Sequence, residues 1–188
     1  MRSVFLPSLL MLSLPVFAGC VATEDREPIK DISQQVVPPP TPCFNGLVTR
    51  TQGFWKNHSC VVKGEATGYS LLPITLGASF LLDKPEDVEE YLGTPPGGDK
   101  QIILGHQLLA AKLNVAAFGI GEIEFADWDG DGTNETVSEL LVIADVLFDS
   151  GSAADQAKMS TVLDKLNNEG HDEDLWFDPK CKSVASCE

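Results

Sequence analysis

The segment from Asp127 to Glu139 holds the residues whose types and spacing most clearly indicate chemistry. Acidic side chains alternate with other residues from position 127 to 131, and Gly132 follows where a sharp turn would be needed. Ca²⁺ is a hard cation that takes roughly six to eight oxygen ligands, and alternating carboxylates can point toward one centre. The sequence therefore predicts a calcium site with the ligands Asp127, Asp129, Asp131, Thr133, Glu135 and Glu139.

The acidic segment resembles the loops of EF-hand-like and dockerin-like modules over residues 127–135 only. Ser138 stands where those loops carry their last acid, and Glu139 comes one residue later. Glu139 also fits a capping box with Thr136 at the start of the next helix. No helix is expected before the loop, since residues 119–125 look extended. An acidic surface turn is the alternative to a metal site, and the spacing favours calcium.

Three histidines, His58, His106 and His171, are the other candidates for chemistry. Together with nearby acids they could form a metal site for hydrolysis. The sequence has no His-x-x-x-His, Gly-x-Ser-x-Gly or Walker pattern. His106 lies on an apolar helix face, which is typical of a hydrogen-bonded core histidine, and His58 is placed like a structural residue in a turn. A non-enzymatic module is therefore favoured, with a metal-dependent hydrolase as the alternative.

The N-terminus has the pattern of an export signal. Arg2 precedes an apolar run over residues 4–17, and Ala18 and Gly19 lead directly to Cys20. This end resembles the lipobox of bacterial lipoproteins, which implies removal of residues 1–19 and acylation of Cys20 with palmitate-type chains. Val21 after the cysteine favours anchoring in the outer membrane of the cell envelope. An ordinary cleaved signal with an incidental cysteine is the alternative.

Residues 20–42 and the remaining cysteines suggest how the folded domain is linked to its membrane anchor and how it is stabilised. The segment mixes charges with a run of prolines at 38–40, which is typical of an extended tether. An even number of cysteines in an exported chain favours two disulfides, pairing either locally or across the ends of the domain. Zinc is the alternative, although no Cys-x-x-Cys spacing occurs. The cysteines concerned are Cys43, Cys60, Cys181 and Cys187.

The charge of the chain limits its partners. With 13 Lys and Arg against 28 Asp and Glu, the formal net charge is −15. Nucleic acid is therefore excluded as an expected partner, because phosphate contacts need clustered cations. A lipid bilayer contacted through Cys20 is expected, whereas the pattern does not identify a protein or glycan partner.

One helix must organise the fold that positions these groups. Residues 101–119 are apolar on nearly all sides, so this helix should be covered on most faces. A helix is expected to start within 83–86, with Asp83 as N-cap and Glu86 reaching back to it, and to end by Gly93. Further helices are expected at 136–149 and, capped by Ser152, up to residue 169. Residues 74–82 should form a short hairpin or extended stretch. The sequence thus predicts a mainly α, disulfide-stapled single domain over residues 43–188, with an irregular or short-β N-terminal part and an acidic insert at 121–135.

Two motifs carry a resemblance to a known family. Residues 51–58 read Thr-Gln-Gly-Phe-Trp-Lys-Asn-His, and residues 106–114 read His-Gln-Leu-Leu-Ala-Ala-Lys-Leu-Asn. With Ile-Thr-Leu-Gly at 74–77 and Thr-Pro at 94–95 between them, the chain resembles a family of exported bacterial proteins over residues 49–168. It departs from that family at Ser59-Cys60 and in the insert. The resemblance implies an exported location and this architecture, and it implies no activity.

Overall fold

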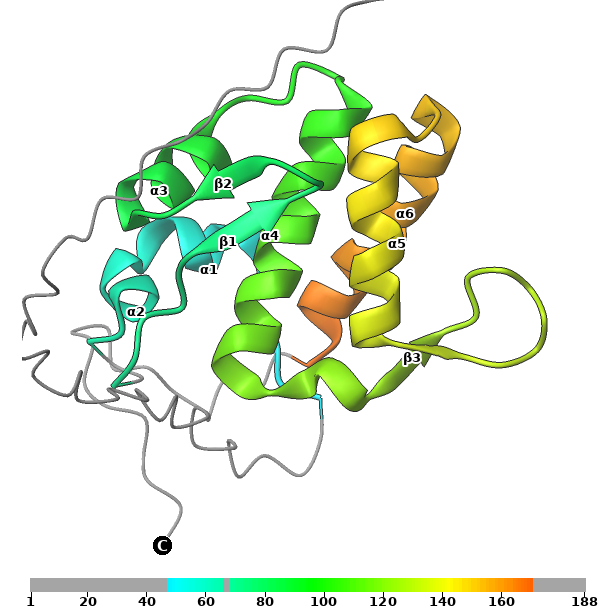
Figure 1. Cartoon of the computed structure of the whole chain (residues 1–188), viewed down its shortest axis with the longest axis horizontal. Coiled ribbons are helices and arrows are strands. Elements are labelled where there is room, and N and C mark those ends of the chain that lie inside the picture. Colours follow the sequence, from blue (N-terminus) through cyan, green and yellow to red (C-terminus); the bar gives the residue numbers. More distant parts are fainter. Residues whose placement is uncertain (1–46, 66–67, 171–188) are drawn as a thin grey trace, which may run out of the picture. The chain divides into compact units, whose positions relative to one another are not determined.

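The computed structural model describes residues 47–65 and 68–170, all of which belong to the unit Pro38–Glu188. Cys20, Cys43, Cys181, Cys187 and His171 lie outside these residues. The described part is mainly helical with two small sheets, which confirms the predicted mainly α class (Figure 1). The N-terminal part, expected to be irregular or short-β, contains a small hairpin within 74–82 but also two short helices at 52–57 and 59–63. In chain order its elements are α1 (Gln52–Asn57), α2 (Ser59–Lys63), β1 (Ile74–Leu76), β2 (Phe80–Leu82), α3 (Pro85–Gly93), α4 (Lys100–Phe118), the 3₁₀ turn η1 (Ile120–Glu122), β3 (Glu124–Ala126), β4 (Glu135–Thr136), α5 (Val137–Ser150) and α6 (Ala153–Glu169).

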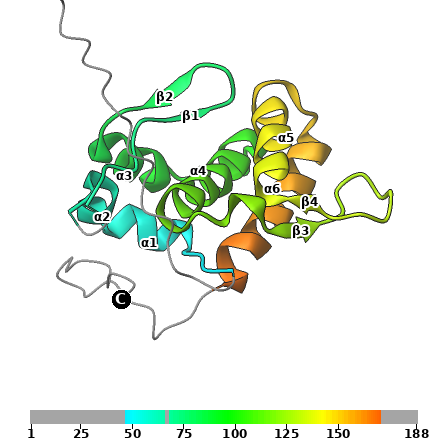
Figure 2. The ribbon, with the colours of Figure 1, turned by 60° about the horizontal axis from the view of Figure 1, so that its bottom comes forward.

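Helix α4 is the central element, as its apolar pattern predicts. It starts at an Asp99 cap, whose carboxylate accepts hydrogen bonds from the Gln101 and Ile102 amides, and it ends at Gly119 in the left-handed conformation (φ 66°). Helices α5 and α6 pack along one side of it, while α1 and strand β1 contact it on other sides (Figures 1 and 2). Burial on so many faces explains why the helix has hardly any amphipathic character.

Polar side chains inside α4 join it to three other segments. Asn114 is fully buried and accepts hydrogen bonds through Oδ1 from the Arg50 amide (2.7 Å) and the Trp55 indole N–H (3.2 Å). Its Nδ2 donates to the Arg50 carbonyl and to Asn167 Oδ1 on α6, both at 2.9 Å. Asn167 in turn donates to the carbonyl and side-chain oxygen of Gln107. This network, which we call the Asn114 network, is satisfied entirely within the protein.

The N-terminal segment closes onto the end of α6. The Thr49 amide donates to the Gly170 carbonyl (3.2 Å), and the Gly170 amide donates to Thr49 Oγ1 (3.1 Å). The Thr51 hydroxyl caps α1 by accepting from the Phe54 amide, and Trp55 is completely buried against α4. Because the Trp55 indole N–H also donates to Asn114 Oδ1, the two motifs found in the sequence contact each other in the fold.

The start of α3 differs from its prediction. Lys84, and not Asp83, is the N-cap residue, and Asp87, and not Glu86, reaches back. Asp87 Oδ2 accepts hydrogen bonds from the Asp83 and Lys84 amides (3.3 and 3.1 Å). The prediction is wrong by one residue because Pro85 takes the first helical position, where its fixed φ and missing N–H fit best. The end of α3 at Gly93 is as expected.

Strands β1 and β2 form the predicted hairpin, with Thr75 opposite Leu81. Helix α5 holds its turn, because Asp145 Oδ1 accepts from the Gly77 amide (2.8 Å) and Asp149 Oδ2 from the Ala78 amide (2.7 Å). Lys112 of α4 adds a half-buried ion pair with Asp145 (2.6 Å) and a hydrogen bond to the Thr75 carbonyl (2.5 Å). One helix pair thus fixes the position of the hairpin.

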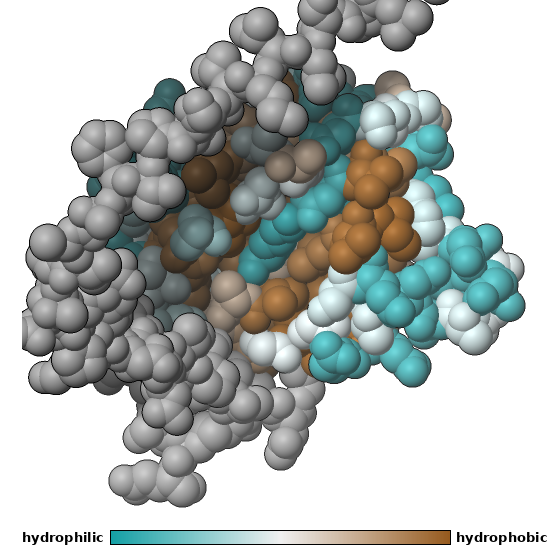
Figure 3. All heavy atoms as spheres, in the orientation of Figure 1, coloured by the Kyte–Doolittle hydropathy of each residue, from teal (hydrophilic) through white to brown (hydrophobic). Residues whose placement is uncertain are grey.

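Helices α5 and α6 start at caps that the sequence predicts. Thr136 and Glu139 form the capping box of α5, and the Ser152 hydroxyl accepts from the Asp155 amide at the start of α6. Both helices bury an apolar stripe against α4, but Val142 and Val146 of α5 remain 66% and 60% exposed. Figure 3 shows this part of α5 as a hydrophobic area on the visible face. In the described ranges no helix is long and apolar enough to cross a membrane.

Candidate functional site

The acidic loop is positioned by the small sheet of β3 and β4. Glu124 pairs with Thr136 and Ala126 with Glu135, with an irregularity between these pairs. Because the strands are short, residues 127–134 project beyond the helices as an open loop (Figures 1 and 2). Lys158 of α6 anchors its base by donating to the Trp128 carbonyl (2.8 Å), and its ammonium lies 3.9 Å from the centre of the Trp128 ring.

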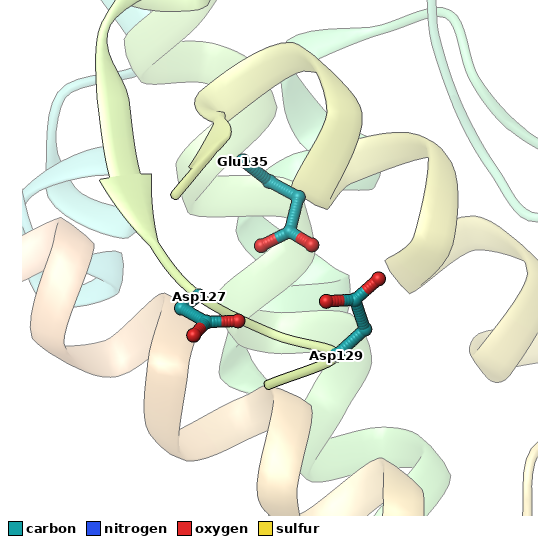
Figure 4. Close-up of side chains that lie close together, drawn as sticks. All are labelled: Asp127, Asp129 and Glu135. Carbon is teal, nitrogen blue, oxygen red and sulfur yellow. The ribbon is translucent and has the colours of Figure 1, made fainter. Parts of the chain in front are cut away.

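Three carboxylates of this segment come together. Asp127, Asp129 and Glu135 each offer an oxygen such that the three atoms lie within 4.8 Å of one another. Figure 4 shows their side chains pointing toward a common centre, two from the loop and one from β4. Asp127 and Asp129 are exposed, and Glu135 is partly buried. Among the described residues this is the one group of His, Cys, Asp or Glu with metal-ligand spacing.

Backbone amides of the loop hold these carboxylates in place. Asp127 accepts hydrogen bonds from the Gly130 and Gly132 amides (2.6 and 3.0 Å), and Glu135 accepts from the Trp128 amide (2.6 Å). The two glycines have φ values of 82° and 92°, in the left-handed region. The sharp turn that the sequence predicts at Gly132 is therefore present, and it aims an amide at the first acid of the loop.

Asp131 and Glu139, predicted as ligands, are not in the group of three. The Asp131 carboxylate accepts from the amide and hydroxyl of Thr133 (2.8 and 2.5 Å), a local turn that directs it to its own backbone. Glu139 Oε2 accepts from the amide and hydroxyl of Thr136, both at 2.8 Å. These hydrogen bonds lower the pKa of both carboxyl groups. The structure gathers the carboxylates of the first, third and ninth loop positions, whereas the sequence predicted Asp131, the Thr133 carbonyl and Glu139 as ligands as well.

The donor set suits a hard divalent cation. Carboxylate oxygens are preferred by Ca²⁺ and Mg²⁺, and no sulfur or imidazole belongs to the group. The loop stands in solvent, so water could supply the remaining ligands. Ca²⁺ accepts a variable number and geometry of oxygen ligands, whereas Mg²⁺ requires a near-octahedral arrangement.

His58 has a structural position between α1 and α2. Its Nδ1 makes a hydrogen bond with the Phe54 carbonyl (2.7 Å), and its ring stacks on the Phe54 ring with centroids 4.0 Å apart. The residue ends α1 and begins α2. This geometry uses one ring nitrogen to close the first helix, in agreement with the structural role expected for this histidine.

His106 lies in the core between α4 and α3. It is 6% exposed, its ring meets the Tyr91 ring edge to face at 5.3 Å, and its Nε2 makes no hydrogen bond. Burial lowers the pKa of His106, and the nearby Lys56 lowers it further, against the opposite effect of a hydrogen bond to the Tyr91 backbone. Burial and the Asp99 carboxylate raise the pKa of Tyr91 to about 12. Neither described histidine belongs to the metal-spaced group.

The Asn114 network was not predicted, although three of its members, Trp55, Gln107 and Asn114, lie within the two motifs. Polar residues in an otherwise apolar helix were the available signal, because a buried amide requires partners.

Comparison of the chain with models of protein families, with curated proteins and with solved structures finds no match. The function is therefore inferred from the geometry of the described residues.

Proposed function

We propose that this protein is a lipid-anchored lipoprotein of the bacterial cell envelope, whose helical domain binds one Ca²⁺ at Asp127, Asp129 and Glu135. The domain serves as a binding or structural module and performs no reaction. Cys20 carries the acyl chains, and residues 20–42 hold the domain away from the outer membrane. The resemblance to exported bacterial proteins agrees with this location.

The convergence of three carboxylates carries the calcium part of the proposal. Like charges within 4.8 Å repel one another, and a divalent cation between them would remove that repulsion. Hydrogen bonds from the loop amides already hold Asp127 and Glu135, so little ordering is left to accompany binding. Asp131 and Glu139, which are engaged elsewhere, are not needed as ligands.

The hydrolase alternative, with His58, His106 and His171, finds no support among the described residues. His58 uses Nδ1 to bind the Phe54 carbonyl, and His106 is buried beside Tyr91. A hydrolytic metal site needs ligands that face a substrate and an open coordination position. His171 lies outside the described residues.

Calorimetric titration with CaCl₂, together with melting curves in Ca²⁺ and in EDTA, tests the metal site. We expect saturable binding and a higher melting temperature in Ca²⁺, since a ligand that binds only the folded state stabilises it by about 2.7 kcal/mol at one hundred times its Kd. The variant D127N/D129N/E135Q should lose both effects. MgCl₂ at equal concentration should stabilise the chain less than CaCl₂ does.

Two matched variants separate this site from the general acidity of the chain. D131N changes an acid of the same loop that lies outside the group, and E89Q/E90Q removes two exposed acids from α3. Both should keep most of the calcium effect. Identical melting curves in Ca²⁺ and EDTA, with no heat of binding, would refute the calcium site.

Metabolic labelling tests the lipid anchor. Labelled palmitate should enter the wild-type chain in a bacterial host and should not enter Cys20→Ala. The same variant should move from the membrane fraction to the soluble fraction. If Cys20→Ala were labelled as strongly as the wild type, the anchor at this position would be wrong.

A further inference from the structure

Helix α5 presents an apolar stripe to solvent with a carboxylate at each end. Glu139, Val142, Val146 and Asp149 follow one another at helical spacing and lie on one face of the helix. Val142 and Val146 are 66% and 60% exposed, and the half-buried Ile143 lies beside them. The area is visible on the face shown in Figure 3. An open groove of about 430 Å³ begins here, lined by Glu135, Ser138, Glu139, Val142 and Ile143.

The charge around this stripe has a single sign. Helix α5 contains no Lys, Arg or His, and its acids are Glu139, Asp145 and Asp149. Asp145 is neutralised by Lys112, but Glu139 and Asp149 are exposed. Hydrogen bonds from Thr136 and from the Ala78 amide hold these two carboxylates in position. Glu139 and Asp149 are ten positions apart in the helix, which corresponds to about 15 Å along its axis.

We propose that this face, the α5 stripe, binds a basic amphipathic helix of another protein. Such a helix would place its apolar side chains on Val142 and Val146, and two cations spaced about 15 Å apart on Glu139 and Asp149. The charges of the two helices would be complementary on either side of an apolar centre. This complementarity would fix the register of the bound helix along α5. The four residues that carry the interaction, Glu139, Val142, Val146 and Asp149, are not calcium ligands, although Glu135 of the calcium group lines one end of the groove.

Other occupants of the α5 stripe fit less well. A second copy of this chain would bring Glu139 and Asp149 against the same acids, which repel. The acidic rim likewise opposes contact with an anionic lipid surface. A basic amphipathic helix satisfies both the apolar and the charged residues of the face.

Fluorescence anisotropy with three labelled synthetic peptides tests the proposal on the full chain. The first is a helical peptide with a leucine stripe and lysines roughly ten positions apart. The second has Gln in place of those lysines, and the third has the composition of the first with its leucines scattered around the helix. The first should bind the wild type at least about tenfold more tightly than either of the others. V142Q/V146Q should weaken its binding at least about tenfold, a loss of about 1.4 kcal/mol or more.

Charge variants check the two ends of the stripe. E139Q/D149N keeps the capping box and the Ala78 acceptor, and it should weaken binding and remove most of its salt dependence. E89Q/E90Q on α3 removes the same number of charges and should change the affinity less than about twofold. Far-UV circular dichroism and melting curves check that each variant is folded.

Three results would overturn the proposal. Equal losses in E139Q/D149N and E89Q/E90Q would mean that only the net charge attracts the peptide. Self-association of the chain that V142Q/V146Q abolishes would assign the face to a second copy. Binding to phosphatidylcholine vesicles that the same variant abolishes would assign it to a bilayer.

Discussion

The carboxamides of Asn114 and Asn167 meet inside the protein, with Asn114 Nδ2 2.9 Å from Asn167 Oδ1 and both residues fully buried. This contact joins α4 to α6 at the level where Arg50 and Trp55 also bind Asn114. Elsewhere these two helices meet mainly through apolar side chains, which fix no single register. The amide pair supplies that register because each side chain finds its partners only in one relative position of the helices.

Replacement of Asn114 should be among the most destabilising single changes in the helical domain. In Asn114→Ala the Trp55 indole and the Arg50 amide lose their acceptor in the core, which should lower the free energy of unfolding by about 3 kcal/mol. Asn114→Asp should cost a similar amount, because its second oxygen would face the Arg50 carbonyl and Asn167 Oδ1. Urea unfolding measures both. Asn168→Ala is the matched control, because Asn168 is exposed and bonds only within α6, and it should change stability by less than about 0.5 kcal/mol.

The Lys112–Asp145 pair should stabilise the hairpin more than an exposed pair would. Lys112→Met removes the ion pair and the bond to the Thr75 carbonyl, and we expect a loss of about 2 kcal/mol in urea unfolding. Lys165→Met breaks the exposed pair with Glu169 (3.7 Å) and should cost less than about 0.5 kcal/mol. Equal effects of the two substitutions would contradict the role given to Lys112.

Gly105 lets α3 and α5 approach the central helix closely. A Cβ built at this position would lie 2.0 Å from Tyr91 Oη and 2.8 Å from the Phe148 ring, so Gly105→Ala must displace one of them. We expect a loss of about 1–3 kcal/mol, measured by thermal or urea unfolding. Gly53→Ala in α1, where the nearest atom is 3.7 Å away, is the control and should be neutral or stabilising. A neutral Gly105→Ala would show that Tyr91 moves away without loss.

His106 should make stability fall as the pH is lowered from 7.5 to 5.5. Its pKa in the folded chain is lowered, mainly by burial, so the unfolded chain binds the proton more tightly. The stabilisation is complete above the unfolded pKa of about 6.5 and decreases as the pH falls below it. Urea unfolding at the two pH values should show this loss in the wild type and a smaller loss in His106→Gln. The window lies above the ordinary range of carboxyl pKa values, and Tyr91, whose pKa is raised to about 12, does not titrate within it. An unchanged pH dependence in His106→Gln would assign the effect to other groups.

Helices α3 to α6 could be predicted because apolar periodicity and local signals specified them: Gly119 ends α4, Thr136 and Glu139 start α5, and Ser152 starts α6. Helices α1 and α2 were not predicted, because six and five residues are too few to show a helical period. At α3 the sequence predicted that Glu86 would reach back to the N-cap. Pro85 occupies the first helical position, so Asp87 takes that role instead. Such a one-residue difference lies within the usual uncertainty of helix ends.

The candidate site could be predicted in part. Spacing alone placed Asp127, Asp129 and Glu135 in one loop, and the structure brings their oxygens together. It did not show that Thr133 engages Asp131 or that Thr136 engages Glu139, since those bonds depend on the local backbone path. The exposure of Val142 and Val146 could not be foreseen either, because α5 is apolar on the face that packs and on the face that does not.

The hydrogen bonds between Thr49 and Gly170 have a consequence for how the chain could be rearranged. They place the entry and exit of the helical domain at one point, so a short linker could connect the two ends without disturbing the helices. New termini could then open in the exposed loop between Asp129 and Asp131, which lies outside the helices and contains no member of the Asn114 network. We therefore expect the helices to pack in the same arrangement when they are synthesised in a different order.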